Sequence, residues 1–371
     1  MRAGFPNAQS VRIAQFLAEP LLTTTNRLQA TDLGAMTDKP NASFQTNGRR
    51  ALICGVSGQD GAYLAKLLLS KGYEVFGTSR DAQVSHFGKL EKLGIRDKVK
   101  LESMAVTDFR SVLQAIRKTS PDEIYNLAGQ SSVALSFQQP VETLESIAQG
   151  TLNLLEAIRF VERPIRFYNA SSSECFGDTG GAAANETTPF KPRSPYAVAK
   201  AAAFWEVANY REAYGLYACS GILYNHESPL RPERFVTRKV VAAACRIAAG
   251  SDEVLHLGNV SVRRDWGWAP EYVEAMWLML QQEAPEDFVI ATGEVNSLAS
   301  FVEAAFSEAG LEWKDHVELD PAFLRPTDLA SGLGDPTLAA KKLGWSARYR
   351  MRDVVRMMVE GERSLTAGKP L

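Results

Sequence analysis

Cysteine and histidine are scarce in this sequence, and neither residue type forms a cluster. The chain contains four cysteines and four histidines. The cysteines are far apart, without a Cys-x-x-Cys pair, at positions Cys54, Cys175, Cys219 and Cys245. This spacing matches neither a disulfide framework nor a metal-binding motif. We therefore expect reduced thiols in a reducing compartment and no metal site.

Charge of one sign and long apolar runs are also lacking. The 41 lysines and arginines nearly balance the 43 aspartates and glutamates, which leaves a formal net charge of −2. A balanced surface has no global field that would attract nucleic acid or an anionic membrane. No apolar run approaches the length that spans a bilayer. We therefore expect a cytoplasmic protein with no nucleic-acid partner and no membrane association.

The first 48 residues differ from the rest of the chain. Residues 1–48 are rich in threonine, asparagine, glutamine and alanine, and Pro20 interrupts their only amphipathic stretch, residues 11–22. They lack the continuous apolar segment of a signal peptide. This composition predicts a disordered extension, with Met36 as an alternative start of the chain.

A glycine-rich turn follows the first apolar run. Residues 50–55 have the pattern of a short buried strand, and a helical pattern follows that ends near Gly72. Gly55, Gly58 and Gly61 stand between the two. Glycines at this spacing permit a tight turn and let a pyrophosphate approach the helix N-terminus. The sequence thus predicts a dinucleotide-binding turn.

The end of the second expected strand, residues 73–79, bears on the identity of the dinucleotide. Arg80 and Asp81 follow that strand, about twenty residues after the glycine turn, where the group that contacts the cofactor ribose is found. An arginine there suits the 2′-phosphate of NADP, whereas an acid suits the free 2′-hydroxyl of NAD. Because Arg80 comes first, we expect NADP, and Asp81 leaves NAD as the alternative.

Strand and helix patterns alternate along the following chain. Further strands are expected at residues 99–103, 123–127, 165–168 and 217–224, with helices at 109–118 and 141–160. This alternation predicts an α/β fold with a Rossmann-type, doubly wound parallel sheet over residues 49–224. The later pattern is irregular, with a short strand near 254–257 and helices near 271–281, 298–309 and 351–364. We expect a smaller C-terminal α/β substrate lobe at 225–371, partly discontinuous and sharing strands with the sheet.

One expected helix carries a tyrosine and a lysine in a chemically informative arrangement. Ser194 suits an N-cap and Pro195 suits the first helical position. Tyr196 and Lys200 then lie one turn apart on the same helix face. A lysine ammonium beside a phenol lowers the pKa of the phenol, so the tyrosine can act as a base near neutral pH. The alternative is an amphipathic helix with Tyr196 inward and Lys200 in solvent.

Hydroxyl groups and a carboxylate precede this helix. Residues 171–173 are serines and Glu174 follows them, after the strand expected at 165–168. Open parallel sheets bind their ligands at the carboxyl ends of the strands. The candidate catalytic residues are Ser172, Glu174, Tyr196 and Lys200. A surface carboxylate is the alternative for Glu174.

Together with the glycine turn, these residues resemble the extended short-chain dehydrogenase/reductase superfamily. Several stretches between residues 50 and 362 are similar to the GDP-mannose 4,6-dehydratase family within it. They are Gly58-Gln-Asp-Gly61, Tyr125-Asn-Leu-Ala, Thr188-Pro-Phe-Lys-Pro-Arg-Ser-Pro-Tyr196, Tyr224-Asn-His-Glu-Ser-Pro229, Phe235-Val-Thr-Arg-Lys239, Leu257-Gly-Asn259, Arg264-Asp-Trp-Gly267, Asp287-Phe-Val-Ile-Ala-Thr-Gly293 and Arg325-Pro-Thr327. The Asn-His-Glu-Ser-Pro and Arg-Asp-Trp-Gly stretches are specific to this branch, whereas the glycine turn is not.

The resemblance implies a redox-neutral dehydration of GDP-mannose or a related GDP-sugar, with a bound nicotinamide. Tyr196 would take the proton of the sugar 4-hydroxyl, and Lys200 would sustain the phenolate and hold the nicotinamide ribose. Ser172, where the family has a threonine, would hydrogen-bond the 4-oxygen. Glu174 would remove the C5 hydrogen as water leaves C6, and hydride would return to C6 to give a 4-keto-6-deoxy sugar.

The resemblance also implies two sets of binding residues. The cofactor would contact Gly55, Gly58, Gln59, Asp60, Gly61, Arg80, Asp108 and Leu127, in addition to Tyr196 and Lys200. The GDP-sugar would contact Ser131, Asn225, Lys239, Arg264, Arg325 and Asp328. Cations and an amide suit a diphosphate, although each cation could equally be a structural charge.

The chain departs from the family pattern at several positions. Asp81 stands where the family has a second arginine, and Ala105 stands where it has an aspartate that faces the adenine. Ser132 and Trp268 each replace a histidine, and Asp328 replaces the longer glutamate. Because Ser132 adjoins the sugar-facing Ser131, the hexose is less well defined than the reaction.

Other activities share this fold. A GDP-4-keto-6-deoxyhexose reductase or a C4 epimerase would use the same tyrosine and lysine, but neither needs a base at C5, so Glu174 argues against both. A dehydratase of another GDP-hexose also fits the motifs. A non-catalytic NAD(P)-sensing protein would need the glycine turn alone. The resemblance further implies a homodimer or homotetramer.

Overall fold

The structure is a computed structural model that describes residues 48–323 and 327–369. The extension expected over residues 1–48, with the alternative start at Met36, lies outside the described residues apart from Gly48. The candidate substrate residue Arg325 also lies outside them.

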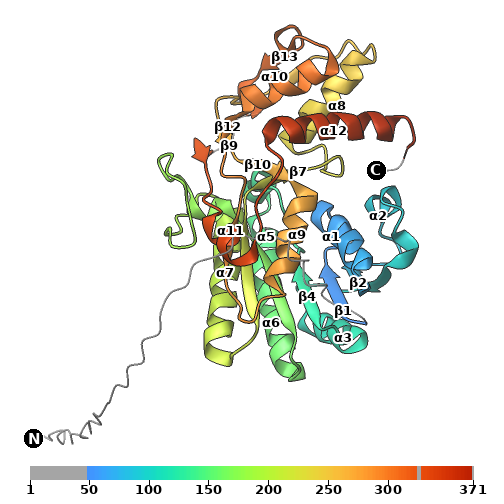
Figure 1. Ribbon diagram of the computed structural model, residues 1–371, viewed down its shortest axis with the longest axis vertical. Coiled ribbons are helices and arrows are strands. Elements are labelled where there is room, and N and C mark those ends of the chain that lie inside the picture. Colours follow the sequence, from blue (N-terminus) through green and yellow to red (C-terminus); the bar gives the residue numbers. More distant parts are fainter. Residues whose placement is uncertain (1–47, 324–326, 370–371) are drawn as a thin grey trace, which may run out of the picture. The chain divides into compact units, whose positions relative to one another are not determined.

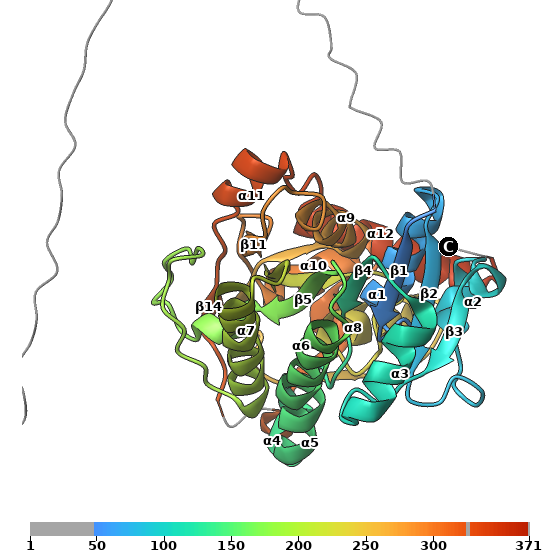
Figure 2. The ribbon, with the colours of Figure 1, turned by 90° about the horizontal axis from the view of Figure 1, so that it is seen from below.

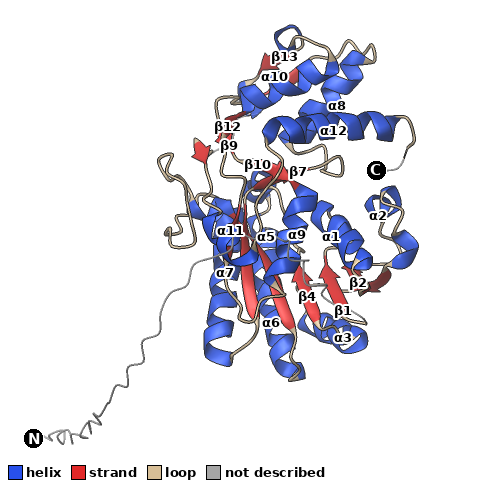
Figure 3. Cartoon of the chain, viewed as in Figure 1, coloured by secondary structure: helices blue, strands red, loops and turns tan. Residues whose placement is uncertain are grey.

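A seven-stranded sheet forms the centre of the described chain, and Figure 3 shows its strands in red. The order is β3-β2-β1-β4-β5-β6-β11, and all neighbouring strands are parallel. The strands span Arg50–Cys54 (β1), Glu74–Ser79 (β2), Lys100–Ser103 (β3), Glu123–Asn126 (β4), Arg166–Ser172 (β5), Ala218–Leu223 (β6) and Phe288–Ile290 (β11). This doubly wound order confirms the expected Rossmann-type fold, with the chain reversing direction across the sheet between β1 and β4.

Helices cover both faces of this sheet. One face packs against α1 (Gln59–Ser70), α2 (Gly88–Lys92), α9 (Ala269–Met279) and α11 (Thr337–Leu343). The other packs against α3 (Phe109–Thr119), α6 (Gly150–Val161) and α7 (Pro195–Tyr214). Figure 2 shows α3, α6 and α7 together on the side of the sheet away from α9 and α11.

The first strand shows why both faces are covered. Side chains alternate between the two faces of a strand. Ala51 and Ile53 join the apolar core on the α1 face, whereas Leu52 and Cys54 join the core on the α3 face. All four are completely buried. A parallel sheet that is buried on both faces requires such a continuous apolar run, which the first strand provides.

The later part of the chain adds a second group of elements, drawn above the sheet in Figure 1. Helices α8 (Val236–Ala248), α10 (Leu298–Ala309) and α12 (Met351–Thr366) pack around one apolar core that includes Trp266, Phe301 and Phe306. Short strands join this group: β7 (Asn225–Glu227), β8 (Leu255–Leu257), β9 (Arg263–Arg264), β10 (Trp266–Trp268), β12 (Asn296–Ser297), β13 (Val317–Leu319) and β14 (Ser331–Gly332). Strand β11 and helix α9 come from the same half of the chain but belong to the central sheet layers. None of the described helices is long and apolar enough to cross a membrane.

Several elements differ from the expectation. The helix expected at 141–160 is divided into α5 (Pro140–Leu144), a π-helical turn at Glu145–Gln149, and α6. A π turn places one extra residue in the helix, and apolar spacing alone does not reveal it. Strand β5 continues to Ser172 because its serines pair with β6, Ser172 standing opposite Leu223. Helices α2, α4 (Val133–Gln138), α8 and α11 were not expected from the sequence.

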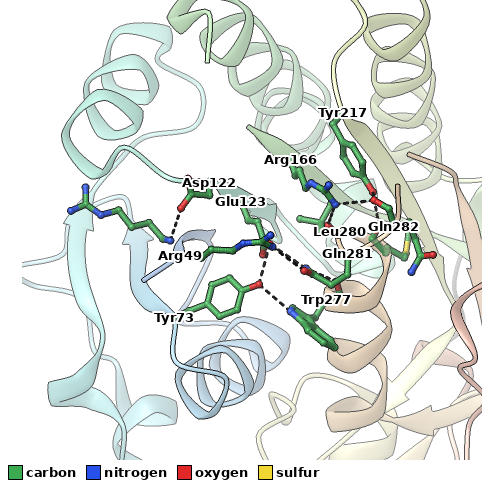
Figure 4. Close-up of polar contacts among 12 residues, drawn as sticks. Arg49, Tyr73, Asp122, Glu123, Arg166, Tyr217, Trp277, Leu280, Gln281 and Gln282 are labelled. Carbon is green, nitrogen blue, oxygen red and sulfur yellow. Dashed lines mark hydrogen bonds and ion pairs between the residues drawn. The ribbon is translucent and has the colours of Figure 1, made fainter. Parts of the chain in front are cut away.

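A buried carboxylate joins the amino ends of the strands to α9 (Figure 4). Glu123 begins β4 and is 1% exposed. Its Oε1 accepts hydrogen bonds from Tyr73 at 3.0 Å and from Gln281 at 3.1 Å, and its Oε2 accepts one from Tyr125 at 2.7 Å. The Arg49 guanidinium, 3.2 Å away, supplies the opposite charge. A buried carboxylate is stable only with such a set of donors.

The same end of the sheet holds the C-terminal end of α9. The last carbonyl groups of a helix have no partner within the helix. The Tyr217 hydroxyl donates to the carbonyls of Met279 and Gln282 at 3.1 and 2.9 Å. Arg166 donates to the carbonyls of Leu280 and Gln282 (Figure 4). These bonds fix a helix from the second half of the chain against the sheet of the first half.

The variant Glu123→Ala removes the acceptor that these donors share. We expect the free energy of unfolding to fall by about 3 kcal/mol, because buried hydrogen bonds to a charged group contribute about 1.5–3 kcal/mol. Urea-induced unfolding measures the loss. Glu74 is the matched control, since it pairs with Arg50 and Lys100 at the surface. Glu74→Ala should cost under about 1 kcal/mol, and an equal loss in both variants would contradict the role of Glu123.

Candidate functional site

The carboxyl ends of β1 and β4 meet where the strand order reverses. Gly55 follows β1 with a φ of +86°. A Cβ on Gly55 would lie 2.8 Å from the Leu127 carbonyl oxygen, and one on Gly61 would lie 2.5 Å from the Gly55 carbonyl oxygen. The amide of Gly58 donates to the Gly55 carbonyl at 3.0 Å and closes the turn. Gly55 and Gly61 are therefore required by the local geometry.

This glycine turn fits the phosphates of a nicotinamide dinucleotide. Helix α1 begins directly after the turn, and its N-cap residue Gly58 offers no side-chain oxygen to the amides of the first helical turn. Those N–H groups and the positive end of the helix dipole are left for an anion. The absence of Cβ atoms leaves room for the anion to approach the backbone.

The two residues between the glycines, Gln59 and Asp60, bind the second half of the chain. Gln59 Nε2 donates to the His226 carbonyl at 3.1 Å, and the Ser228 hydroxyl donates to Gln59 Oε1 at 2.7 Å. Asp60 Oδ2 lies 3.0 Å from His226 Nε2. Both side chains therefore hold β7 and the residues after it against the glycine turn.

His226 carries a positive charge in this arrangement. Its Nδ1 lies 2.7 Å from the Tyr224 carbonyl oxygen and its Nε2 faces the Asp60 carboxylate. Both oxygens only accept hydrogen bonds, so both ring nitrogens carry hydrogen. Burial lowers the pKa of His226, but the Asp60 carboxylate outweighs this effect and the pKa stands above its usual 6.5. Burial raises the pKa of Asp60, whereas His226 lowers it, and the net value is about 2.

Ser172 and Glu174 lie at the carboxyl end of β5. Ser172 is the last residue of the strand, and Glu174 lies in the 3-10 turn at Ser173–Phe176. The Ser172 hydroxyl accepts a hydrogen bond from the Glu174 amide at 3.3 Å. Ser172 is buried and Glu174 is half-buried. The turn thus holds the two candidate catalytic residues side by side at the ligand-binding edge of the sheet.

Helix α7 brings Tyr196 and Lys200 to the same edge. The Ser194 hydroxyl accepts a hydrogen bond from the Ala197 amide at 3.1 Å, so the expected N-cap is confirmed. Lys200 is only 9% exposed, and its Nζ donates to the Ala170 carbonyl at 2.7 Å. The Nζ lies 5.8 Å from the centroid of the Tyr196 ring. The alternative that places Lys200 in solvent is therefore wrong.

Tyr196 does not have the lowered pKa that the sequence predicted. Burial raises the pKa of the phenol above its usual range, and hydrogen bonding to Ser172 opposes that effect only in part. The ammonium of Lys200 is directed at the Ala170 carbonyl, and burial lowers its own pKa to about 8. The cation that lowers the pKa of Tyr196 is Arg231. The described residues alone therefore keep the phenol protonated at neutral pH.

Arg80 and Asp81 follow β2 and differ in what their side chains contact. Asp81 Oδ1 accepts hydrogen bonds from the amides of Gln83 and Val84 at 2.9 and 3.3 Å. The carboxylate is thus used within its own turn. No ion pair or hydrogen bond among the described residues engages the Arg80 guanidinium, which remains available to an anion.

Asp108, another candidate cofactor residue, is the N-cap of α3. Its Oδ1 accepts a hydrogen bond from the Arg110 amide at 2.9 Å. This bond satisfies one of the free amides at the start of the helix. The residue lies in the loop after the carboxyl end of β3, at the same edge as the glycine turn.

Two candidate substrate cations lie among the short strands and helices of the second group. Arg264 is buried in β9, with Nη2 2.8 Å from Asp328 Oδ1 and Nη1 2.7 Å from the Leu329 carbonyl oxygen. Lys239 on α8 donates to the His256 carbonyl at 2.7 Å. Burial lowers the pKa of Lys239. The structure therefore brings Arg264 and Asp328 together as an ion pair.

The remaining candidate substrate residues lie nearer the sheet. Asn225 begins β7 and stands opposite Trp266 of β10. Ser131 follows β4, and its hydroxyl accepts a hydrogen bond from Arg234 at 3.4 Å. The neighbouring Ser132 caps α4 by accepting a hydrogen bond from the Leu135 amide.

Over the described ranges, no group of three or more histidines, cysteines or carboxylates could hold a metal ion.

Two contacts between motifs were missed in the sequence. Besides the pair formed by Asp60 and His226, the carboxylate of Asp265 accepts bonds from the Thr292 and Gly293 amides at 3.0 and 2.9 Å. Asp265 is completely buried, and burial raises its pKa to about 6. All of these residues lie in stretches that the family resemblance had marked. A single sequence shows which stretches matter but not which of them contact one another.

Comparison with known proteins agrees with this geometry. The family model described as GDP-mannose 4,6 dehydratase matches residues 52–358. A protein of Arabidopsis thaliana named GDP-mannose 4,6 dehydratase 1 is 47% identical over 325 residues, covering 85% of this chain and 90% of its own. A protein of Sinorhizobium fredii named GDP-mannose 4,6-dehydratase is 46% identical over 347 residues, which cover 87% of this chain and 99% of that protein. The solved structure of Thermus thermophilus UDP-glucose 4-epimerase with NAD has a TM-score of 0.75 at 27% sequence identity. The match covers 85% of this chain and 99% of that one.

The variant His226→Gln tests the charge of the pair between His226 and Asp60. A group whose pKa is raised by folding stabilises the folded protein at pH values below its unfolded pKa, which is about 6.5 for histidine. This stabilisation is lost as the pH rises through the pKa that the group has in the folded protein. We expect the variant to be less stable by about 1.5–3 kcal/mol near pH 6, the loss of a buried charged hydrogen bond. The difference should shrink as the pH rises through the raised pKa of His226, while Asp60 remains ionised.

Thermal unfolding over a pH series measures this difference. The exposed His86 provides the control, since His86→Gln should leave the pH dependence of stability unchanged. A difference between wild type and His226→Gln that grows with pH would show that the ring is neutral in the folded protein.

Proposed function

Because the chain belongs to the GDP-mannose 4,6-dehydratase family, we propose that it converts GDP-mannose to GDP-4-keto-6-deoxymannose as a hydro-lyase. The observation that supports this best is the convergence of four side chains at one edge of the sheet. They are Ser172, Glu174, Tyr196 and Lys200. A carboxylate beside the tyrosine is what a dehydratase requires, because elimination needs a base at C5 of the sugar.

The first half of the reaction oxidises C4 of the sugar. A bound nicotinamide supplies reversible hydride transfer, from C4 in this half and to C6 in the second. In our proposal Tyr196 accepts the proton of the 4-hydroxyl, and Ser172 hydrogen-bonds the 4-oxygen. Since burial opposes the phenolate, nearby groups must favour it, and the hydrogen bond with Ser172 and the charge of Arg231 do so. Lys200 is held in place by its bond to the Ala170 carbonyl.

The second half eliminates water. The C4 carbonyl acidifies the C5 hydrogen, which the Glu174 carboxylate removes as a proton. Glu174 passes this proton to the C6 hydroxyl, which leaves as water and produces a C5–C6 double bond. As C6 is reduced, the proton held by Tyr196 would be available for C5. The proton and hydride removed from C4 and its oxygen thus return to C5 and C6, and one water is lost.

The second group of elements would bind the GDP part of the substrate. We assign the cofactor and the chemistry to residues 49–224 and the GDP-sugar to residues 225–371. Arg264 and Lys239 suit a diphosphate, and each now donates to protein oxygens that a phosphate could replace. The other proposed contacts are Ser131, Asn225, Arg325 and Asp328.

The hexose is the least determined part of the substrate. Ser132, where the family has a histidine, is occupied as the N-cap of α4. Ser132, next to the proposed sugar contact Ser131, therefore cannot offer the sugar the imidazole that the family has there. For this reason the second candidate function is dehydration of another GDP-hexose. A reductase is disfavoured, because it needs no base at C5, whereas Glu174 is available in the turn that follows Ser172.

NADP is the cofactor that the end of β2 supports. The Asp81 carboxylate is engaged by the Gln83 and Val84 amides, so it is poorly placed to accept a ribose hydroxyl. Arg80 precedes it with a guanidinium that suits a 2′-phosphate. NAD remains the alternative.

A homodimer is the assembly that the surface supports, with a homotetramer as the alternative. Helices α5 and α7 pack together and expose a set of apolar side chains on their outer faces, namely Val141, Leu144, Val198 and Trp205. Such a patch marks a protein contact. The four cysteines are free thiols, three of them buried, which suits a reducing compartment such as the cytoplasm.

The two half-reactions can be separated with Glu174→Gln. Glutamine keeps the size and polarity of the side chain but cannot accept a proton, so elimination should slow by about 10²-fold or more. Oxidation at C4 should survive. With GDP-mannose and stoichiometric NADP, the variant should accumulate reduced cofactor, seen by near-ultraviolet absorbance, without the loss of water that mass spectrometry detects in the wild type.

Tyr196→Phe is the matched control, because it removes the base for the first step and should give neither signal. Near-normal formation of the 6-deoxy product by Glu174→Gln would remove the dehydratase assignment. No loss of water from GDP-mannose in the wild type would favour a different hexose.

Arg80→Ala tests the choice of cofactor. A charge-assisted contact to the 2′-phosphate contributes about 1.5–3 kcal/mol. Affinity for NADPH should therefore fall by about tenfold or more, while affinity for NADH, which has no 2′-phosphate, should change little. Fluorescence titration measures both. Equal losses for the two nucleotides, or a wild-type preference for NADH, would contradict NADP as the cofactor.

A further inference from the structure

A short segment between β7 and α8 carries arginines toward the cofactor edge of the sheet. This segment, residues 229–235, is here called the strap. Its last residue, Phe235, lies under two guanidinium groups, with Arg231 3.8 Å and Arg234 5.2 Å from the ring centroid. An aromatic ring holds guanidinium groups in a preferred position by cation–π attraction. The Phe235 ring therefore restricts the positions of the Arg231 and Arg234 guanidinium groups.

Arg234 extends from the strap to the loop that follows β4. Its Nη2 lies 3.4 Å from the Ser131 hydroxyl. Ser131 comes only a few residues after Leu127, whose carbonyl lies against Gly55 of the glycine turn. The strap thus reaches from the second group of elements to the loop after β4, one of the two loops between which a dinucleotide binds in this fold.

Lys89 approaches the same place from the opposite side. It lies on α2, in the connection between β2 and β3, and its Nζ donates to the carbonyl of Ser57 at 3.0 Å. Ser57 lies in the glycine turn, directly before Gly58. The ammonium is therefore held at the turn whose amides are free to bind a phosphate.

The charged groups that act on the pKa of Lys89 are two other cations. Burial lowers the pKa of Lys89, and the two charged groups that lower it further, Lys92 and Arg234, are both cations. Arg234 and Lys89 come from distant parts of the chain, yet they are close enough to repel each other. Cations that lie near each other at a phosphate-binding turn are stabilised when an anion lies between them.

We infer that Lys89 and Arg234 form a clamp that binds the pyrophosphate of the nicotinamide dinucleotide across the glycine turn. The clamp joins α2 to the strap, so that the bound dinucleotide links the sheet domain to the second group of elements. This inference rests on the proposed nicotinamide chemistry only for the identity of the ligand. Neither Lys89 nor Arg234 belongs to the glycine turn or to the catalytic group.

Three phosphate groups could in principle reach such a clamp. The 2′-phosphate of NADP is expected at Arg80, after β2, and the diphosphate of the GDP-sugar is expected at Lys239 and Arg264. The bond from Lys89 to Ser57 places the clamp at the glycine turn instead. The pyrophosphate is the part of the dinucleotide that binds there, and it is common to NAD and NADP.

The test is direct binding of nucleotides to Lys89→Gln, Arg234→Gln and the double variant. Fluorescence titration gives the dissociation constants of NADPH and NADH, and calorimetry gives that of GDP. We expect each single variant to bind both dinucleotides about three- to tenfold more weakly, and the double variant at least about 30-fold more weakly, since each loses a charge-assisted contact. The effect should be largest at low ionic strength, because salt screens the cations.

Lys98→Gln and Arg352→Gln are the matched controls, since both residues are exposed and lie outside the clamp. They should bind NADPH and NADH as the wild type does. Thermal unfolding without nucleotide should show that all variants remain folded, so that a loss of affinity reflects a loss of contacts.

Three results would overturn the inference. A loss for NADPH alone would assign the cations to the 2′-phosphate, and a loss for GDP alone would assign them to the substrate. Unchanged affinities in the double variant would show that the cations only stabilise the fold. These outcomes are independent of the dehydratase proposal, because a wild type that binds NADPH but does not dehydrate GDP-mannose would refute that activity and leave the clamp intact.

Discussion

The ion pair between Asp60 and His226 is the contact on which the geometry of the site depends most. It joins the glycine turn, which follows β1, to β7, which follows β6. The ring of His226 is stacked on Tyr272 of α9 at 4.5 Å, so the pair is fixed from the other side as well. Because both partners are charged, with His226 buried and Asp60 half-buried, removing either would leave an uncompensated charge, and the pair holds the two halves of the chain together.

This constraint continues through the second group of elements. Strand β7 pairs with β10, so Asn225 stands opposite Trp266, and the adjacent Asp265 binds the amides that follow β11. Arg264 directly precedes Asp265. The position of the proposed GDP site relative to the glycine turn is thus set by a short series of contacts between motifs. At the opposite edge of the sheet, the Glu123 network fixes α9, which carries Tyr272, against the strands (Figure 4).

The features that could be predicted from the sequence are those that depend on local chemistry. The N-cap Ser194, the turn at Gly55 and Gly61 and the parallel strand order follow from residue types and their spacing. The features that could not be predicted depend on distant contacts. The sequence does not show that His226 is the partner of Asp60 or that a π turn interrupts the helix expected at 141–160. It also does not show that Glu123 accepts hydrogen bonds from the distant residues Arg49, Tyr73 and Gln281. The lowered pKa expected for Tyr196 was wrong for the same reason, because burial by distant parts of the chain raises that pKa, and Lys200 Nζ donates to the Ala170 carbonyl.

The electrostatics of Tyr196 link the catalytic edge to the strap. Burial raises the pKa of the phenol, and the hydrogen bond with Ser172 and the charge of Arg231 lower it in part. Arg231 is held over Phe235, the aromatic residue that also lies near Arg234. Any ligand that draws Arg234 toward the glycine turn therefore acts on the segment that carries Arg231. In the proposed mechanism the strap therefore carries both Arg231, whose charge favours the phenolate, and Arg234, which would contact the dinucleotide.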